Sequence, residues 1–284
     1  MLDYDPVRYK QTQKQNWNAN APHYHESFVG PQAGPFQENA RLVRAAQVGV
    51  GDHVLDVATG TGAVALELAK AVGQSGKVVG VDLSPGMLAL ARQGAKAFPW
   101  LELLEVDAEA LTFEQAFDAV TCQFGLMFFP DVQGALSGMR RALKPHGRLA
   151  VAVHGRPENV PFFTAITQTV MDAFPPQQPN AGPGPLRFSD PDKLRAELQA
   201  AGFERVQLES SNCEIRFPSV DHYWHTFFQG SPRSFADQLE GLSEGALQEL
   251  KASVRSRAQA YLHGNELRFP WEVTVAAAQK PSAD

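Results

Sequence analysis

The sequence has little cysteine, no surplus of basic residues and no long apolar run. Its 284 residues include only two cysteines, Cys122 and Cys213, which lie far apart and match no metal-ligand spacing. Reduced thiols are therefore expected, rather than a disulfide or a zinc site. Lys and Arg number 25 against 31 Asp and Glu, and the resulting net charge of −6 argues against nucleic acid as the partner.

Signals for secretion or membrane insertion are also missing from the sequence. The opening segment, MLDYDPVRYKQTQKQNW, has no apolar core of the signal-peptide type. No window approaches the roughly 20 apolar residues of a membrane span. The sequence therefore predicts a cytoplasmic protein without a membrane span. Hydrophobic residues make up 44% of the chain and include 18 Phe, which is ample material for a buried core.

Short β-branched runs alternate with stretches of helical period between residues 51 and 152. This rhythm predicts βαβ units and a parallel sheet. Ser84 and Pro85 have the residue types of a helix N-cap and first turn, and Asp131 is a second N-cap candidate. The five expected strands are HVLDVA (53–58), KVVGVD (77–82), LELLEV (101–106), FDAVTCQ (117–123) and GRLAVAVH (147–154).

Beyond residue 154 the connections lengthen and become rich in aromatic residues. A helix is expected over PFFTAITQTVMDAF, followed by a breaker-rich loop, PPQQPNAGPGP. Ser189 is expected to cap the next helix, which leads into a sixth strand, ERVQLES. A second helical insert then carries DHYWHTFF and SEGALQELKASVRSRAQAYL before a last strand, PWEVTVAAAQ.

The segment VLDVATGTGA, residues 54–63, places a carboxylate and then a glycine loop after a predicted strand. Glycines here let a ligand approach the backbone and the next helix N-terminus closely. GTGAVA also fits the dinucleotide pattern, whose ligand is a pyrophosphate. Asp56 favours another ligand, because a carboxylate about 4 Å from a pyrophosphate costs on the order of 4 kcal/mol. S-adenosylmethionine instead brings cationic groups, which Asp56 would help to hold directly or through water.

Two further carboxylates follow at the ends of the second and third predicted strands. Asp82 would accept hydrogen bonds from the hydroxyls of a ribose, and Asp107 from the amino group of an adenine. Met87 either covers one face of that adenine or fills the core. Because the strands are parallel, these carboxylates and Asp56 are expected at one edge of the sheet.

Five segments in this order resemble the motifs of class I S-adenosylmethionine-dependent methyltransferases, particularly the group of ubiquinone and menaquinone C-methyltransferases. The resemblance covers residues 48–153 and continues weakly through 200–209. The five segments are VLDVATGTGA, VVGVDLSPGML, EVDAEAL, FDAVTCQFGLMFFPD and RRALKPHGRLAVAV. Ala58 departs from the family pattern, because many class I enzymes have the first glycine of the loop at this position.

The resemblance implies cofactor contacts residue by residue. Ala58, Gly60 and Gly62 would lie along the methionine part of S-adenosylmethionine. The other contacts that it implies are Asp82 and Leu83 with the ribose and adenine, Asp107 and Ala108 with the adenine, and Gln123 with the cofactor's amino end. Upstream, QNWNANAPHYHESF resembles the segment that closes over the cofactor in many relatives. Trp17 and Tyr24 are therefore expected to form a wall of the site.

The family fold is a Rossmann-like, mostly parallel α/β sheet of seven strands, in which the antiparallel last strand inserts between strands five and six. Inserts after strands five and six would add a helical cap. The expected organisation is an N-terminal helical lid (1–45), a cofactor-binding core (46–154), a cap insert (155–188), a core continuation (189–213), a helical cap insert (214–266), and the last strand with the tail (267–284).

Methyl transfer from a sulfonium needs alignment and desolvation first, and a general base only if the acceptor must lose a proton. The candidate bases are His154 after strand five, His25 in the lid, and His222 with His225 on the insert helix. The last two have no third ligand nearby in the sequence, so no metal site is expected.

The inserts supply an aromatic set suited to a small hydrophobic or aromatic acceptor: Phe162, Phe163, Phe174, Tyr223, Trp224, Phe227 and Phe228. The same residues would also form the core of the cap. The sequence thus favours a methyltransferase that acts on oxygen, nitrogen or carbon of such an acceptor, with S-adenosylhomocysteine as the second product. An NAD-dependent oxidoreductase and a non-catalytic S-adenosylmethionine-binding module remain the alternatives.

Overall fold

A single mixed sheet organises the molecule, and its strands run in the order β3-β2-β1-β4-β5-β8-β6. The computed structural model describes residues 4–29, 34–174, 182–230, 239 and 242–282. A two-residue strand, β7, pairs with β8 outside that order. The strands are β1 (His53–Val57), β2 (Lys77–Asp82), β3 (Leu101–Glu105), β4 (Phe117–Gln123), β5 (Leu143–His154), β6 (Glu204–Phe217), β7 (Leu262–His263) and β8 (Glu266–Gln279).

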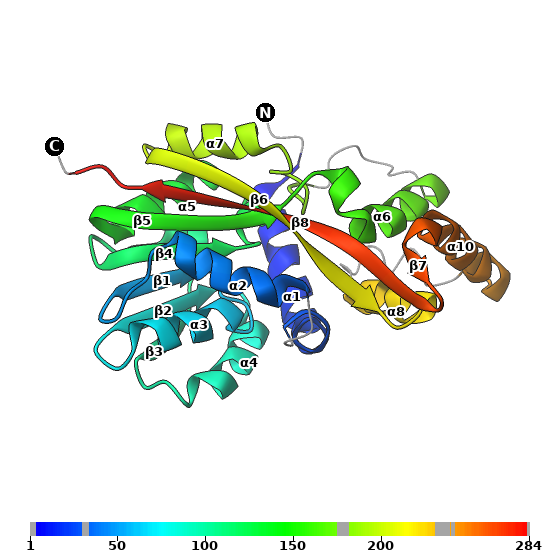
Figure 1. The fold of residues 1–284 in the computed structure, drawn as a ribbon, viewed down its shortest axis with the longest axis horizontal. Helices are drawn as coiled ribbons and strands as arrows, with labels where there is room; N and C mark the ends of the chain where they lie inside the picture. The colour runs from blue at the N-terminus through cyan, green and yellow to red at the C-terminus, as the bar shows by residue number, and fades with distance from the viewer. Residues whose placement is uncertain (1–3, 30–33, 175–181, 231–238, 240–241, 283–284) are drawn as a thin grey trace.

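Helices cover both faces of this sheet, and each face has its own hydrophobic cluster (Figure 1). Along β1, Val54 points into the cluster beneath α2 and α3, whereas Leu55 and Val57 point into the cluster beneath α5 and α7. Such alternation is the period of two expected of a strand buried on both sides. The helices are α1 (Pro6–Phe28), α2 (Gly34–Ala45), α3 (Ala63–Val72), α4 (Pro85–Ala95), α5 (Val132–Ala142), α6 (Pro161–Ala173), α7 (Pro191–Ala200), α8 (Val220–Gly230) and α10 (Glu244–Arg257).

The predicted insertion of the last strand is confirmed. β8 pairs antiparallel with β5 on one side and with β6 on the other, whereas β1 to β5 pair in parallel. β6 continues to Phe217, past the expected start of the cap insert at residue 214, because Cys213, Ile215 and Phe217 are buried in alternation with exposed neighbours. The long β6 and β8 ribbon leaves the core and reaches α6, α8 and α10, which form the cap (Figure 1).

Helix starts follow the predicted local chemistry with one exception. The side chains of Ser84 and Asp131 cap α4 and α5 as expected, each accepting a hydrogen bond from a backbone N–H in the first turn. The predicted cap Ser189 is wrong by one residue. Asp190 caps α7 instead, because its carboxylate accepts from the Asp192 N–H and the proline at the next position suits the first turn.

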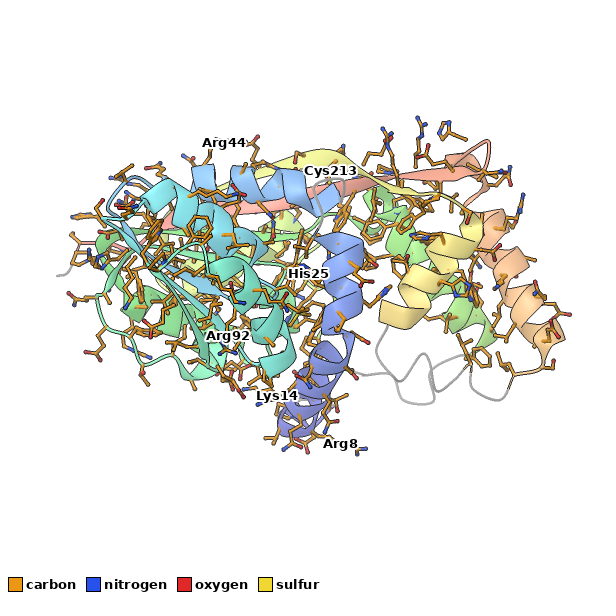
Figure 2. All side chains as sticks on the ribbon, turned by 90° about the horizontal axis from the view of Figure 1, so that it is seen from below. Arg8, Lys14, His25, Arg44, Arg92 and Cys213 are labelled. Atoms are coloured by element: carbon orange, nitrogen blue, oxygen red, sulfur yellow. The ribbon has the colours of Figure 1, made fainter. Side chains whose placement is uncertain are left out.

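Helix α1 lies between the core and the cap, with Arg8 and Lys14 in its N-terminal half (Figure 2). The Tyr9 hydroxyl donates to the Pro183 carbonyl, 2.7 Å away, and the Asn18 side chain accepts from the Gly86 N–H at 2.7 Å. The helix therefore contacts both the loop after α6 and the start of α4. No helix within the described residues is both long and apolar enough to cross a bilayer.

Candidate active site

The loop after β1 turns through three residues with positive φ: Ala58 at 55°, Gly60 at 55° and Gly62 at 89°. Gly62 starts α3, where an added Cβ would lie 3.1 Å from the Cβ of Ala91. A Cβ at Gly60 would meet nothing within 4 Å, so the backbone there faces open space. Ala58 takes a conformation that glycine adopts freely, at a cost of roughly 1–2 kcal/mol for other residues. Ala58, which stands where many class I enzymes have glycine, thus adopts the conformation that the loop needs.

Asp56 lies behind the loop and is 1% exposed. Its two carboxylate oxygens accept hydrogen bonds from the hydroxyls of Thr59 and Thr121, each at 2.7 Å. Burial raises the pKa of Asp56 to about 6, although both hydroxyls act in the opposite direction. A cationic group near this carboxylate would favour its charged form.

Asp82 connects the glycine loop to the start of α4. One carboxylate oxygen accepts from the Gly60 N–H and the other from the Ser84 N–H, both at 2.8 Å. Burial raises the pKa of Asp82, and these backbone donors oppose the shift. The carboxylate is held rigidly at the strand end, where the ribose was expected.

Asp107 lies two residues beyond the end of β3 and contacts the N-terminal helix. Its carboxylate accepts from the Glu109 N–H at 3.0 Å and from the Lys10 ammonium at 2.8 Å. Lys10 also pairs with the Glu109 carboxylate at 2.6 Å. Helix α1 is therefore tied to the strand edge at the position where the adenine was expected.

One cavity of about 1260 Å³ joins the strand ends to the underside of the cap. A second cavity, of about 40 Å³, lies beside the glycine loop and is lined by Asp56. Gly62 lines neither of them. The predicted cofactor residues that line the large cavity are Tyr24, Ala58, Gly60, Asp82, Leu83, Met87, Asp107, Ala108 and Gln123.

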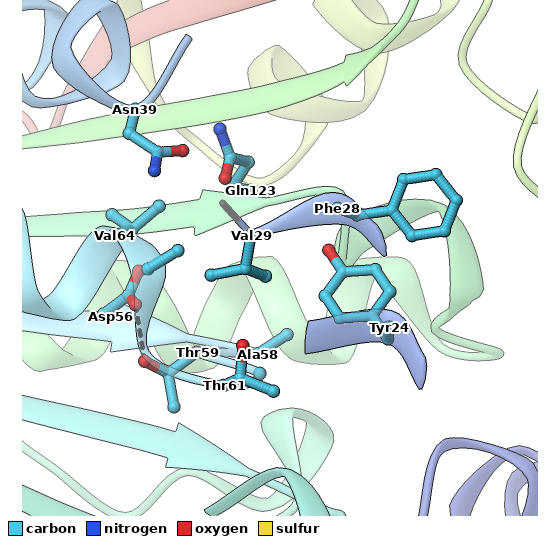
Figure 3. A pocket seen from close by; sticks show the side chains of 12 residues that line it. Tyr24, Phe28, Val29, Asn39, Asp56, Ala58, Thr59, Thr61, Val64 and Gln123 are labelled. Atoms are coloured by element: carbon cyan, nitrogen blue, oxygen red, sulfur yellow. Dashed lines mark hydrogen bonds between the residues drawn. The ribbon is translucent and has the colours of Figure 1, made fainter. Parts of the chain in front are cut away.

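Three buried polar atoms around the small cavity have no partner among the described residues. They are Asn39 Nδ2, Thr61 Oγ1 and Gln123 Nε2 (Figure 3). Buried polar atoms are normally hydrogen-bonded, so a group of three fits a polar ligand better than an apolar one. Asn39 and Thr61 were not predicted. Asn39 lies on α2, outside every motif, and its only sequence signal is an amide within an otherwise amphipathic helix.

The N-terminal helix contributes aromatic rings to the wall of the large cavity. The Trp17 ring meets the rings of Tyr24 and Phe128 edge-on, both at 5.7 Å between centroids. All three residues line the cavity. Trp17 and Tyr24, from the segment that resembles the family's lid, thus line the large cavity.

The candidate bases separate into one buried histidine and three exposed ones. His154 is buried and lines the large cavity. His25, His222 and His225 are exposed and line neither cavity, so the structure does not bring them to the site. On α8 the reason is amphipathicity, because Tyr223 and Phe227 occupy the buried face and the two histidines lie on the opposite one. In the described part of the chain, no group of three His, Cys, Asp or Glu side chains is arranged to hold a metal ion.

The cap aromatics divide between core and cavity. Phe163 and Phe227 line the large cavity, together with Phe124 and Trp271 from the core strands. Phe162 and Tyr223 are fully buried instead, and the Tyr223 hydroxyl donates to the Phe162 carbonyl. Among the other predicted aromatics, Trp224 is buried, Phe174 is half-buried, and the side chain of Phe228 lies outside the described residues.

Comparison with known proteins relates the core of this chain to quinone methyltransferases. Residues 38–177 match the ubiE/COQ5 methyltransferase family. A demethylmenaquinone methyltransferase from Staphylococcus carnosus is 34% identical over 182 residues, which cover 60% of this chain and 75% of that protein. A 2-phytyl-1,4-naphtoquinone methyltransferase from Thermosynechococcus vestitus is 34% identical over 167 residues, covering 55% of this chain and 74% of that protein.

Solved structures share the fold at lower identity. A Haemonchus contortus phosphoethanolamine N-methyltransferase 2 superposes with a TM-score of 0.58 at 20% identity, covering 96% of this chain and 60% of that one. The cyclase SpnF superposes with a TM-score of 0.60 at 19% identity, covering 96% and 97%. Because a cyclase and a methyltransferase share this architecture, these two similarities establish the fold only.

Proposed function

Because this chain belongs to the ubiE/COQ5 methyltransferase family, we propose that its large cavity holds S-adenosylmethionine at the strand ends and a flat aromatic acceptor beneath the cap. The chain is an S-adenosylmethionine-dependent methyltransferase for a small hydrophobic acceptor. This assignment favours methyl transfer over nicotinamide-dependent oxidoreduction and over mere cofactor binding. The observation that carries the proposal is the continuity of one cavity from Asp82 and Asp107 to the aromatic residues of the cap.

The described residues fit both ends of the cofactor. At the nucleoside end, Asp82 would accept from the ribose hydroxyls, and Leu83, Met87 and Ala108 would surround the adenine. At the amino-acid end, the unpartnered donors Asn39 Nδ2, Thr61 Oγ1 and Gln123 Nε2 would donate to the cofactor's carboxylate, and Asp56 behind them would attract its ammonium group. Each of these groups would gain the partner that it lacks in the protein alone.

When bound, the cofactor supplies a methyl group on a sulfonium sulfur. The acceptor's electron pair would form the bond to the methyl carbon while the carbon–sulfur bond breaks and its electrons go to sulfur, giving S-adenosylhomocysteine. The proton that a phenol oxygen or a ring carbon loses would go to water. The protein's part is to align the acceptor and to exclude water, which together account for roughly 7–11 kcal/mol of such a barrier. Phe124, Phe163 and Trp271 would hold a flat ring in the cavity.

The acceptor follows from the cavity wall and from the names of the relatives. The wall beneath the cap is largely aromatic, which suits a planar ring more than a branched or charged acceptor. The two relatives named above carry demethylmenaquinone and phytyl-naphthoquinone in their names. We therefore propose a quinol or phenol ring as the acceptor class, with the methyl group added to ring carbon or oxygen.

Calorimetry followed by mass spectrometry tests the proposal. S-adenosylmethionine is expected to bind saturably, NAD is expected not to bind, and quinols or phenols are expected to give a product that carries the labelled methyl group. Aliphatic amines of similar size serve as the comparison set. Saturable NAD binding without a response to S-adenosylmethionine would overturn the cofactor assignment. Methylation of the amines alone would overturn the acceptor class.

Cofactor binding is expected to weaken about tenfold when the pH falls from 7 to 5. Asp56, with a pKa of about 6 in the free protein, is mostly charged at pH 7 and mostly neutral at pH 5, and the ammonium group favours the charged form. Because this pKa is raised above the unfolded value, ionising Asp56 also lowers the stability of the free protein as the pH rises from 4 through 6.

The dissociation constant measured calorimetrically across this range checks the prediction, with Asp56→Asn as the matched variant. Asparagine retains the shape and one acceptor oxygen but has no charge to lose. The variant should therefore show a nearly flat profile between pH 5 and 7. An equal slope in both proteins would assign the pH dependence to another group.

Replacing Lys10 with methionine is expected to speed cofactor dissociation by about 1.4- to fivefold, because partly exposed ion pairs contribute roughly 0.2–1 kcal/mol. Lys10 ties α1 to Asp107 and Glu109, and its side chain is 27% exposed. Stopped-flow dissociation measures the rate. Lys77→Met breaks a comparable exposed pair, with Glu102, away from the cavity, and should leave the rate unchanged. Equal rates in the wild type and the Lys10 variant would show that this ion pair does not hold the lid.

A further inference from the structure

His154 is the last residue of β5 and the polar member of an otherwise aromatic cluster. Its ring stacks on Phe124 with centroids 4.5 Å apart and planes 13° from parallel. The rings of Phe163 and Trp271 lie 4.8 Å and 5.4 Å away. All four residues line the large cavity, so the imidazole lies in the part of the cavity proposed for the acceptor.

One hydrogen bond determines the protonation state of this imidazole. Trp271 Nε1 lies 2.9 Å from His154 Nδ1. An indole N–H only donates, so His154 Nδ1 must be the acceptor and carries no proton. In a neutral imidazole the proton then resides on Nε2, which makes that nitrogen a donor.

Burial keeps the ring neutral. Desolvation lowers the pKa of His154 to about 3, with no charged neighbour contributing to the shift. On the facing strand β8, the nearest charged residue is Glu272, whose carboxylate accepts hydrogen bonds from the Arg156 N–H and the Asn159 amide.

The charged or titratable residues of α6 and α8 also have other surroundings. On α6, Asp172 pairs with Arg257, and on α8, Asp221, His222 and His225 are exposed. Asp56 and Asp82 lie at the cofactor end, and the His23 ring contacts the Thr226 carbonyl.

The hypothesis that His154 is a general base is therefore replaced by a different role. Within the described residues, His154 Nε2 has no hydrogen-bond partner, and the rings that contact the imidazole are those of Phe124, Phe163 and Trp271. A single hydrogen-bond donor in an apolar wall selects strongly among ligands, because a ligand that has no acceptor at that point leaves the donor unpaired.

We propose that His154, held in one tautomer by Trp271, recognises the acceptor through a hydrogen bond from Nε2–H to an oxygen on its ring. This inference rests on the proposed function and narrows it. The site would select rings that carry a carbonyl or a hydroxyl oxygen, protonated or not, and would disfavour rings whose only polar group is an amine. His154 would orient the ring toward the methyl group without taking a proton from it.

Nitrogen-15 NMR of the histidine-labelled full-length protein tests the tautomer. One histidine is expected to remain neutral with its proton on Nε2 from pH 8 to pH 4.5, and its signals should vanish in His154→Gln. In Trp271→Phe the restraint on Nδ1 is gone, so both tautomers should appear. If the signal that vanishes in His154→Gln carries its proton on Nδ1 in the wild type, or titrates near pH 6.5, the proposal is overturned.

Ligand preference tests recognition, with 1-tetralone and tetralin as probes that differ by one ring carbonyl. The wild-type protein, saturated with S-adenosylhomocysteine, is expected to bind 1-tetralone about fivefold more tightly than tetralin, as one neutral hydrogen bond would give. The double variant His154→Phe with Trp271→Phe removes both partners of the bond and should lose this preference. His154→Gln retains an amide donor and should keep part of it.

The cofactor titration is run on the same proteins, so that a failure of the proposed function can be distinguished from a failure of the role proposed for His154. If the wild type does not bind the cofactor, the proposed function fails. If cofactor binding is intact and the double variant still prefers 1-tetralone fivefold, only the role of His154 fails. Thermal unfolding of each variant confirms that the fold is retained before its ligand preference is compared.

Discussion

Asp82→Ala is expected to raise the dissociation constant for S-adenosylmethionine by roughly ten- to 150-fold, which corresponds to about 1.5–3 kcal/mol for hydrogen bonds to a charged acceptor. Two effects contribute. The ribose hydroxyls lose their carboxylate, and the N–H groups of Gly60 and Ser84 lose the acceptor that holds the glycine loop against α4. The loop would then sample other conformations before it binds.

Calorimetric titration of two variants separates these effects. Asp82→Asn keeps one acceptor oxygen for a backbone N–H but removes the charge, so its loss should be smaller than that of the alanine variant. Asp118→Ala is the matched control. That carboxylate is paired with Lys144, accepts from the His53 N–H at the opposite edge of the sheet, and lines neither cavity. An unchanged dissociation constant in Asp82→Ala would remove this residue from the cofactor site.

Phe162→Ala is expected to lower the free energy of unfolding by about 3–5 kcal/mol, the usual cost of deleting a buried phenylalanine. The Phe162 ring is fully buried, with the rings of Phe163 and Trp271 at 4.2 Å and 4.5 Å. Its removal leaves a void where the cap meets β8. Urea unfolding of the variant measures the loss directly.

Phe163→Ala, at the neighbouring position, is the matched variant. Phe163 is half-buried and lines the cavity, so Phe163→Ala enlarges a space that already exists rather than opening a new one. We expect a smaller loss of stability and weaker binding of aromatic acceptors, with cofactor affinity unchanged. If both variants lost the same stability and the same acceptor affinity, the division of the cap aromatics between core and cavity would be wrong.

The geometry at the proposed cofactor end of the cavity could be predicted from the sequence because its signals are local. A carboxylate at a strand end, a loop of small residues and a helix cap are each encoded within a few positions, as with Asp82, Gly60 and Ser84. The topology followed from the family resemblance and is confirmed by the pairing of β8 between β5 and β6.

What the sequence did not reveal depends on distant contacts. Asn39 reaches the site from a helix that precedes every motif, and only the packed structure shows that its amide lacks a partner. The role of His154 depends on Trp271, more than a hundred residues away, whose indole sets the tautomer. For His222 and His225, helical spacing placed both on one face but did not determine which face would meet solvent.

The position of β8 in the sheet also bears on how the chain is made. Among the described strands, β6 pairs with β8 alone, and Trp271 lies on β8. A chain growing on the ribosome presents the nucleoside-binding strands early, while β6 remains an unpaired edge until residues 266–279 emerge. The aromatic wall beneath the cap therefore cannot be completed before this last strand is made, because Trp271 lies on it.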